Sequence, residues 1–189
     1  MEIFIFFGPP GAGKGTQAKK FALKYGFKHI STGELLRHEI TEGTKLGQEA
    51  AEFINEGRLA PDDLVLAIIE DELKTKNVPG YVFDGFPRTL KQAIALDKML
   101  ETDKQSVKAV IHLETREAEL IDRLLKRAQT EGRTDDTEDT ISNRFDIYHV
   151  STMPILNYYK KQNKLIGVDG MGTVDEVEGL IGTVYDKLK

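Results

Sequence analysis

The feature that most constrains this chain is an apolar run at residues 4–7 (FIFF) that leads directly into residues 8–16 (GPPGAGKGT). The run suits a buried parallel strand, and the glycines allow a tight loop whose backbone N–H groups turn inward. Apolar residues at helical spacing follow over 18–25, so a helix adds the positive end of its dipole. The stretch predicts strand, phosphate-cradling loop and helix, with Lys14 as a mobile cation for outer phosphate oxygens.

The loop departs from the general phosphate-loop pattern in one place. That pattern has Ser or Thr directly after the lysine, whereas Gly15 here separates Lys14 from Thr16. An ordinary turn between strand and helix is the alternative interpretation, and the combination of lysine, hydroxyl, strand and helix argues against it. Whether the Thr16 hydroxyl contributes to a Mg²⁺ site stays open at this point.

Composition narrows the class of protein. A length of 189 residues fits one domain better than two independent cores. Hydrophobic residues make up 40% of the chain, and no apolar run reaches the ~18 residues that span a bilayer. The net charge of −5 argues against a broad nucleic-acid surface, and the absence of Cys excludes disulfides and thiolate zinc sites. Strand-like sequence begins directly after Met1, so we expect no targeting peptide and a cytoplasmic location.

Strand-like and helical stretches alternate along the chain, which is typical of a parallel sheet wrapped by helices. The strand-like runs lie at 4–7, 81–83, 107–113 and 165–168, and residues 28–30 add a candidate fifth strand. After the first helix, two short helices between Gly-containing turns, up to Gly57, predict an insertion that packs lightly. Pro61, Asp62 and Asp63 then open a new helix, with two carboxylates at its positive end.

A second informative stretch is residues 82–88 (VFDGFPR). Asp84 ends an apolar strand, where parallel sheets present their chemistry, and can hold Mg²⁺ through water; a turn or helix-cap Asp is the alternative. The planar guanidinium of Arg88 suits a phosphate or carboxylate. In the next helix we expect the buried face to be formed by Leu90, Ala93, Ile94 and Leu100, with Gln92 on a different face.

Arginines surround a polar segment, residues 129–137, in the second half of the chain. Each of them alone is most simply a solvated charge. As a set they predict a lid that brings positive charge over bound phosphates. The set comprises Arg123, Arg127, Arg133 and Arg144. A long helix is expected from about residue 138 with a kink at Pro154, and Thr173 and Glu176 form a capping box for the last helix.

Together these stretches resemble the adenylate kinases of the nucleoside monophosphate kinase family, over nearly the whole chain. The matching stretches are 8–17 (GPPGAGKGTQ), 31–37 (STGELLR), 57–61 (GRLAP), 84–88 (DGFPR) with Gln92, and 132–136 (GRTDD). The resemblance implies an α/β P-loop three-layer fold with a five-stranded parallel sheet. It also implies a single domain, 1–189, with a core at 1–30, 61–126 and 138–189, an AMP-binding insertion at 31–60 and a short lid at 127–137.

The resemblance also implies site residues. The ATP side would comprise Gly11, Ala12, Gly13, Lys14, Gly15, Thr16, Arg123, Arg127 and the backbone near Gly172. The AMP side would comprise Thr32, Arg37, Arg58, Leu59, Ala60, Gly85, Phe86, Pro87, Arg88 and Gln92. Lys14, Arg88, Arg123, Arg133 and Arg144 would stabilise the transferring group, Arg133 and Arg144 from the lid side, and Asp84 would steady Mg²⁺. Relatives with a longer lid carry zinc in certain cases, and this sequence lacks the cysteines for it.

The implied reaction is ATP + AMP ⇌ 2 ADP, with Mg²⁺ carried by ATP and no zinc. AMP phosphate is already anionic, so alignment and charge neutralisation suffice without a general base. A UMP/CMP kinase of the same fold is one alternative, although in adenylate kinases a hydroxyl and an amide at Thr32 and Gln92 face adenine. A non-catalytic nucleotide-binding switch is another, but it would not need the second phosphate set of Arg37, Arg88 and Arg133. We expect a monomer whose partners are ATP, AMP and ADP, not nucleic acid or membrane.

Overall fold

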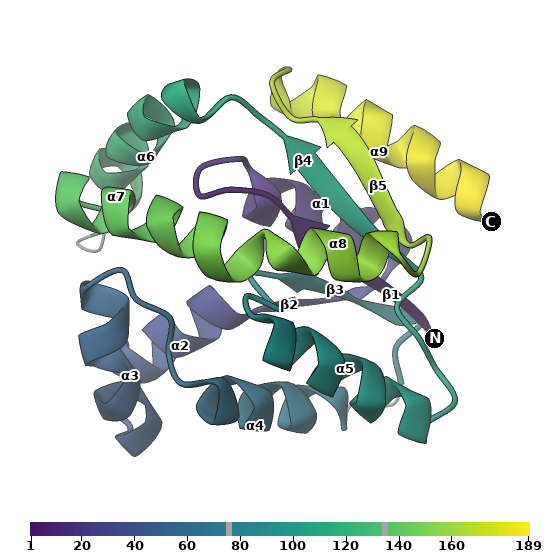
Figure 1. The fold of residues 1–189 in the computed structure, drawn as a ribbon, viewed down its shortest axis with the longest axis horizontal. Helices are drawn as coiled ribbons and strands as arrows, with labels where there is room; N and C mark the ends of the chain where they lie inside the picture. The colour runs from purple at the N-terminus through teal and green to yellow at the C-terminus, as the bar shows by residue number, and fades with distance from the viewer. Residues whose placement is uncertain (75–76, 134–135) are drawn as a thin grey trace.

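In the computed structural model, residues 1–74, 77–133 and 136–189 are described, and strands of this part form one parallel five-stranded sheet (Figure 1). The spatial order is β2-β3-β1-β4-β5. The strands are β1 (Glu2–Phe7), β2 (Lys28–Ser31), β3 (Gly80–Asp84), β4 (Ala109–Glu114) and β5 (Leu165–Asp169). All five expected strands are confirmed, including the candidate at 28–30, and so is the α/β fold class.

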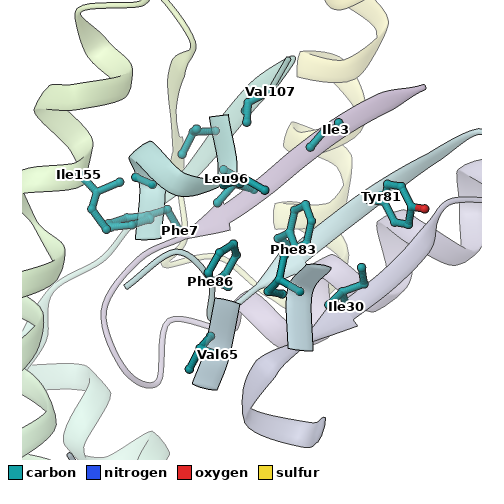
Figure 2. Close-up of a cluster of buried hydrophobic side chains, with 14 of the residues drawn as sticks. Ile3, Phe7, Ile30, Val65, Tyr81, Phe83, Phe86, Leu96, Val107 and Ile155 are labelled. Atoms are coloured by element: carbon teal, nitrogen blue, oxygen red, sulfur yellow. The ribbon is translucent and has the colours of Figure 1, made fainter. Parts of the chain in front are cut away.

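Helices cover both faces of this sheet, because successive strand residues point to opposite sides. Phe4 and Phe6 of β1 pack toward α1 (Lys14–Tyr25) and α9 (Val174–Leu188). Ile3, Ile5 and Phe7 belong to the opposite cluster, shown in Figure 2. That cluster is covered by α4 (Asp62–Leu73), α5 (Leu90–Thr102) and α8 (Pro154–Lys160). The central strand therefore carries two apolar cores and holds its carboxyl end in a fixed place.

Two further pairs of helices lie beside the carboxyl ends of the strands (Figure 1). One pair is α2 (Thr32–Thr41) and α3 (Lys45–Asn55), which pack against each other and bury few side chains in the core. The other is α6 (Glu117–Glu131) and α7 (Glu138–Ile147), with a small apolar cluster of their own around Leu120, Leu124 and Phe145. No helix among the described residues is long and apolar enough to cross a membrane.

Helix α6 corrects the prediction of a polar loop over 129–137, because it continues to Glu131 before Gly132 ends it in the left-handed conformation. Gln and Glu are good helix formers, so polarity alone does not end a helix. Thr134 and Asp135 of the predicted lid lie outside the described residues. The long helix expected from residue 138 is interrupted just before Pro154 by a π-helical turn, η1 (Tyr148–Thr152). The prediction of a capping box at Thr173 is confirmed.

The buried face of α5 differs from the prediction. Leu90 and Ile94 are 41% and 38% exposed, whereas Gln92 is 2% exposed and lies on the same buried face as Leu96 and Leu100. Ala93 and Leu100 are buried as expected. A polar side chain can take such a position only when its donors and acceptors are paired, and the partners of Gln92 supply this.

Candidate active site

A cavity of about 670 Å³ opens where the carboxyl ends of β1, β2 and β3 meet α6 and α7. In parallel sheets this edge is the usual place for a ligand. All predicted site residues line the cavity except Ala12 and Gly172. Ala12 is buried in the core under the loop, and Gly172 lies beside Glu176 in the capping turn of α9. The backbone near Gly172, expected to hold the ATP base, is therefore outside this cavity.

The loop at 8–16 forms the turn that its glycines predict. Gly13, at φ 83°, is the N-terminal cap of α1, so the helix begins at Lys14 with its positive end toward the cavity. The Lys14 ammonium donates to the Pro9 carbonyl at 2.8 Å across the loop. A side chain at Gly15 would place its Cβ 3.1 Å from Asp84 Oδ2. Glycine after the lysine therefore lets the loop pass close to the Asp84 carboxylate.

The floor of the cavity is strongly cationic. Desolvation lowers the pKa of Lys14 from 10.5 to about 8; Asp84 opposes this shift, and Arg88, Arg127 and Arg144 add to it. Desolvation likewise lowers the pKa of Arg88 to about 10, with Arg144 as the largest charge contribution. Positive groups held this close favour an anionic ligand, because an anion relieves both the desolvation and the mutual repulsion.

On the β3 side, hydrogen bonds with uncharged groups hold the cavity wall. The Thr32 hydroxyl and the Arg88 Nε–H both donate to the Gly85 carbonyl at 2.9 Å. The backbone N–H of Arg88 donates to Gln92 Oε1 at 2.7 Å, and its carbonyl accepts from the Thr152 hydroxyl at 2.8 Å. Gly85 has φ 72°, and a Cβ there would lie 3.0 Å from the Arg88 guanidinium, so this turn requires glycine.

On the α6–α7 side, one carboxylate holds two arginines. Asp136 is 3% exposed and accepts two hydrogen bonds at 2.8 Å from Arg127, through Nε and a terminal nitrogen. Arg144 donates to the same carboxylate. Arg123 and Arg133 line the cavity on the same side. All four arginines of the predicted set thus line one cavity, and the buried Asp136 carboxylate orients two of them.

Several contributors were not predicted from the sequence. Tyr148 and Thr152 line the cavity from the π-helical turn. The sequence predicted a kink at Pro154 but not this turn before it. Ser31 donates to Asp84 Oδ2 at 3.3 Å. Lys19 and Glu34 line the cavity and form an ion pair at 2.7 Å between α1 and α2. Exposed charges of this kind carry no sequence signal that separates them from ordinary surface pairs.

Comparisons with known proteins place the chain in a family. The family model described as "Adenylate kinase" matches residues 6–164. The chain belongs to the adenylate kinase family. It is 45% identical over 189 residues, the whole of both chains, to an adenylate kinase of Bacteroides thetaiotaomicron. It is 47% identical to adenylate kinases of a Synechococcus species, with 96% of this chain and 97% of the relative covered, and of Thermus thermophilus, with 93% and 92% covered.

Membership makes this protein a nucleoside monophosphate kinase, and neither the pyrimidine-kinase alternative nor the non-catalytic switch is favoured. The family carries out ATP-dependent phosphoryl transfer, which generally uses Mg²⁺. Among the described residues there is no group of three or more His, Cys, Asp or Glu side chains placed to hold a metal ion. A Mg²⁺ ion that arrives with the nucleotide needs no such group, since it keeps several waters and takes its other ligands from phosphates.

Proposed function

We propose that the cavity catalyses ATP + AMP ⇌ 2 ADP by aligning the two nucleotides and neutralising the charge of the transferring group. The observation that carries this assignment is the meeting of two phosphate-binding sets in one cavity. The loop at 8–16 with Lys14 forms one set, and Arg37 and Arg88 belong to the other. A protein that bound one nucleotide would not need the second set.

The donor side of the proposal uses the loop and the α6–α7 arginines. The N–H groups of residues 11–16 bind the outer phosphates of ATP, and the Lys14 ammonium stays in contact with the phosphoryl group as it is transferred. Arg123 and Arg127 hold donor phosphates, while Arg133 and Arg144 contact the transferring group from the side of α7. Each such contact strengthens as charge spreads over the equatorial oxygens, which is how preorganised cations lower the barrier.

The acceptor side uses the wall formed by β3 and α5. Arg37 and Arg88 bind the AMP phosphate, and Thr32 and Gln92 contact the adenine. Arg58, Leu59 and Ala60 complete the site; in this structure the Arg58 guanidinium lies 4.6 Å from the Phe53 ring centre and pairs with Glu52 and Glu56. No general base is needed because the AMP phosphate oxygen is already anionic.

Mg²⁺ enters this proposal with ATP, and zinc has no part in it. Asp84 is close to Gly15 of the loop, so its carboxylate can hold the hydrated ion, and the Thr16 hydroxyl, which lines the same cavity, is a second candidate ligand. One carboxylate and one hydroxyl suit a water-rich Mg²⁺ rather than a closed site. We expect full activity to return when excess Mg²⁺ follows a chelator; recovery with zinc alone would contradict this.

We further propose that residues 31–60 form an AMP-binding insertion and residues 127–137 a short lid, both of which close over bound nucleotides, around a core at 1–30, 61–126 and 138–189. Both segments bring arginines to the cavity, so bound phosphates would give the two segments common anionic partners. A cytoplasmic monomer that acts on free nucleotides, without nucleic-acid or membrane partners, is consistent with the net charge of −5.

The acceptor panel is the experiment that tests the function. With ATP as donor, kcat/KM is measured for AMP, GMP, CMP and UMP, and AMP should exceed the pyrimidine nucleotides by about tenfold to a hundredfold for each polar group left unpaired. Gln92→Ala should erode this preference, whereas Arg88→Ala should weaken every acceptor equally, because each offers the same phosphate. Equal use of UMP or CMP by the wild type would overturn the assignment.

A further inference from the structure

The amide of Gln92 is held in one orientation by partners that cannot exchange their hydrogen-bonding roles. Its Nε2 donates to Asp62 Oδ1 at 2.8 Å, and its Oε1 accepts from the backbone N–H of Arg88 at 2.7 Å. A carboxylate only accepts and a backbone N–H only donates, so a flipped amide would lose both bonds. The amide nevertheless keeps a second N–H and a second lone pair for a ligand, and Gln92 lines the cavity.

Asp62 reaches Gln92 from another part of the fold. It is the first residue of α4, it does not line the cavity, and its Oδ1 also accepts from the Thr89 hydroxyl at 3.0 Å. The Thr89 hydroxyl in turn accepts from the backbone N–H of Gln92 at 3.1 Å and caps α5. Asp62 thus fixes both the side chain of Gln92 and the helix start that carries it, without contact to the space where a nucleotide would lie.

We propose that Asp62 is a specificity-determining positioning residue that makes the site select adenine over guanine. This rests on the proposed acceptor role of Gln92. On their Watson–Crick edges the two purines present opposite patterns: adenine has an acceptor at N1 beside a donor at the 6-amino group, and guanine has a donor at N1 beside an acceptor at O6. An amide that could flip would match either purine. An amide fixed by Asp62 and Arg88 matches only one.

Thr32 contributes in the same sense. Its hydroxyl proton is committed to the Gly85 carbonyl at 2.9 Å, and the residue is 4% exposed. Toward the cavity this hydroxyl therefore offers lone pairs, which suit an amino group and repel a carbonyl oxygen such as O6 of guanine. Two polar groups on one wall are thereby restricted before any nucleotide arrives. Gly85 restricts Thr32, and Arg88 together with Asp62 restricts Gln92; of these three residues, Asp62 is the one that does not line the cavity.

The test compares the ratio of kcat/KM for AMP to that for GMP, with ATP as donor, in wild type, Asp62→Asn and Asp63→Asn. Asp62→Asn introduces an amide that can donate to a flipped Gln92 as well as accept from the native one. Only the Arg88 N–H then still favours the native orientation, so the ratio should fall about tenfold. Asp63 is the matched control: it has the same charge, in the same helical turn, and is paired with Lys91 outside the cavity. Its substitution should leave the ratio unchanged. Asp62→Ala, which removes the acceptor, is the second variant and should lower the ratio in the same direction.

A double-mutant cycle separates positioning from a general structural role. If Asp62 acts through Gln92, then Asp62→Asn should lower the AMP to GMP ratio no further in a Gln92→Ala background. A wild-type ratio in folded Asp62→Asn and Asp62→Ala, or an additive fall in the double mutant, would overturn this inference and leave the proposed function intact. Failure of the wild type to use AMP at all would instead overturn the proposed function.

Discussion

The two walls of the cavity hold their arginines in different ways. On the β3–α5 wall, the Arg88 guanidinium donates to the Gly85 carbonyl, and the Arg88 backbone bonds to the Gln92 amide and the Thr152 hydroxyl. On the α6–α7 wall, the contacts to Arg127 and Arg144 come from the buried carboxylate of Asp136. Neutral partners orient a cation without reducing its charge, whereas a carboxylate orients it and compensates it. On the first wall Arg88 is already oriented for a ligand anion. On the second wall, bound phosphates would compete with Asp136 for Arg127 and Arg144.

The largest expected effect concerns Lys14, whose pKa is lowered by desolvation and by arginines of both walls. Lys14→Met should lower kcat about a thousandfold, because a positioned cation at the transferring group contributes roughly 3–4 kcal/mol to the transition state. The fold should survive, since the Lys14 ammonium bonds to a loop carbonyl and not to the core. Steady-state turnover with ATP and AMP, together with a thermal melt, measures both. Wild-type turnover by a folded variant would contradict the role of Lys14.

A smaller effect is expected from the anion of the second wall. Asp136→Asn should destabilise the protein by about 2–3 kcal/mol, because the buried site loses the charge that compensates Arg127 and Arg144. Asp139→Asn is the control, as an exposed carboxylate in the first turn of α7. Denaturant unfolding of both variants gives the difference. Equal stabilities would show that the two arginines do not depend on Asp136.

Hydrogen exchange tests whether the proposed closing segments move more than the β3–α5 wall when nucleotides bind. On saturation with a bisubstrate analogue that spans both nucleotide sites, amides of α2, α3 and the last turn of α6, from Arg127 on, should gain protection by about tenfold or more. Residues 85–92 should change less, because their hydrogen bonds are already formed in the free protein. Strand β1 serves as the internal reference. Unchanged exchange in α2, α3 and the last turn of α6 would contradict closure of either segment.

How far the sequence predicts this molecule depends on the kind of signal. The loop at 8–16 and the strand ending at Asp84 were predictable because each is local: glycines, a lysine and an apolar run at fixed spacing. The arginine set was predictable as a group, because several arginines that flank one polar segment of the sequence suggest a shared anionic ligand. The order of Lys14, Gly15 and Thr16 had no local explanation, and the structure shows that Gly15 lies close to the Asp84 carboxylate, a neighbour that the local sequence does not reveal.

The burial of polar residues was not predictable from the sequence. A count of apolar positions placed Gln92 on an outer face of α5, yet its partner Asp62 lies thirty positions earlier, on a different helix. Asp136 stands in a polar, acidic stretch of the sequence, and its buried carboxylate pairs with two arginines from two helices. Pairs of this kind become visible only when the fold brings distant segments together, because each member alone looks like a surface residue.

The smallest expected effect is a pH dependence that belongs to Lys14. Its pKa is lowered to about 8 in the free protein, so the folded state binds this proton more weakly than the unfolded state. The charged lysine therefore costs stability below about pH 8, and the cost fades as the pH rises from there toward its ordinary value of 10.5. Lys14→Met should accordingly be more stable than the wild type near neutral pH, by an amount on the order of 1 kcal/mol, and this advantage should disappear in alkali.

Nucleotide affinity should change in the opposite direction with pH. Phosphates favour the charged lysine, so wild-type affinity for ATP should fall above about pH 8, while the variant's affinity should stay constant. Melting and binding curves of both proteins across this range measure the two trends, and parallel curves for wild type and variant would exclude Lys14 as their source.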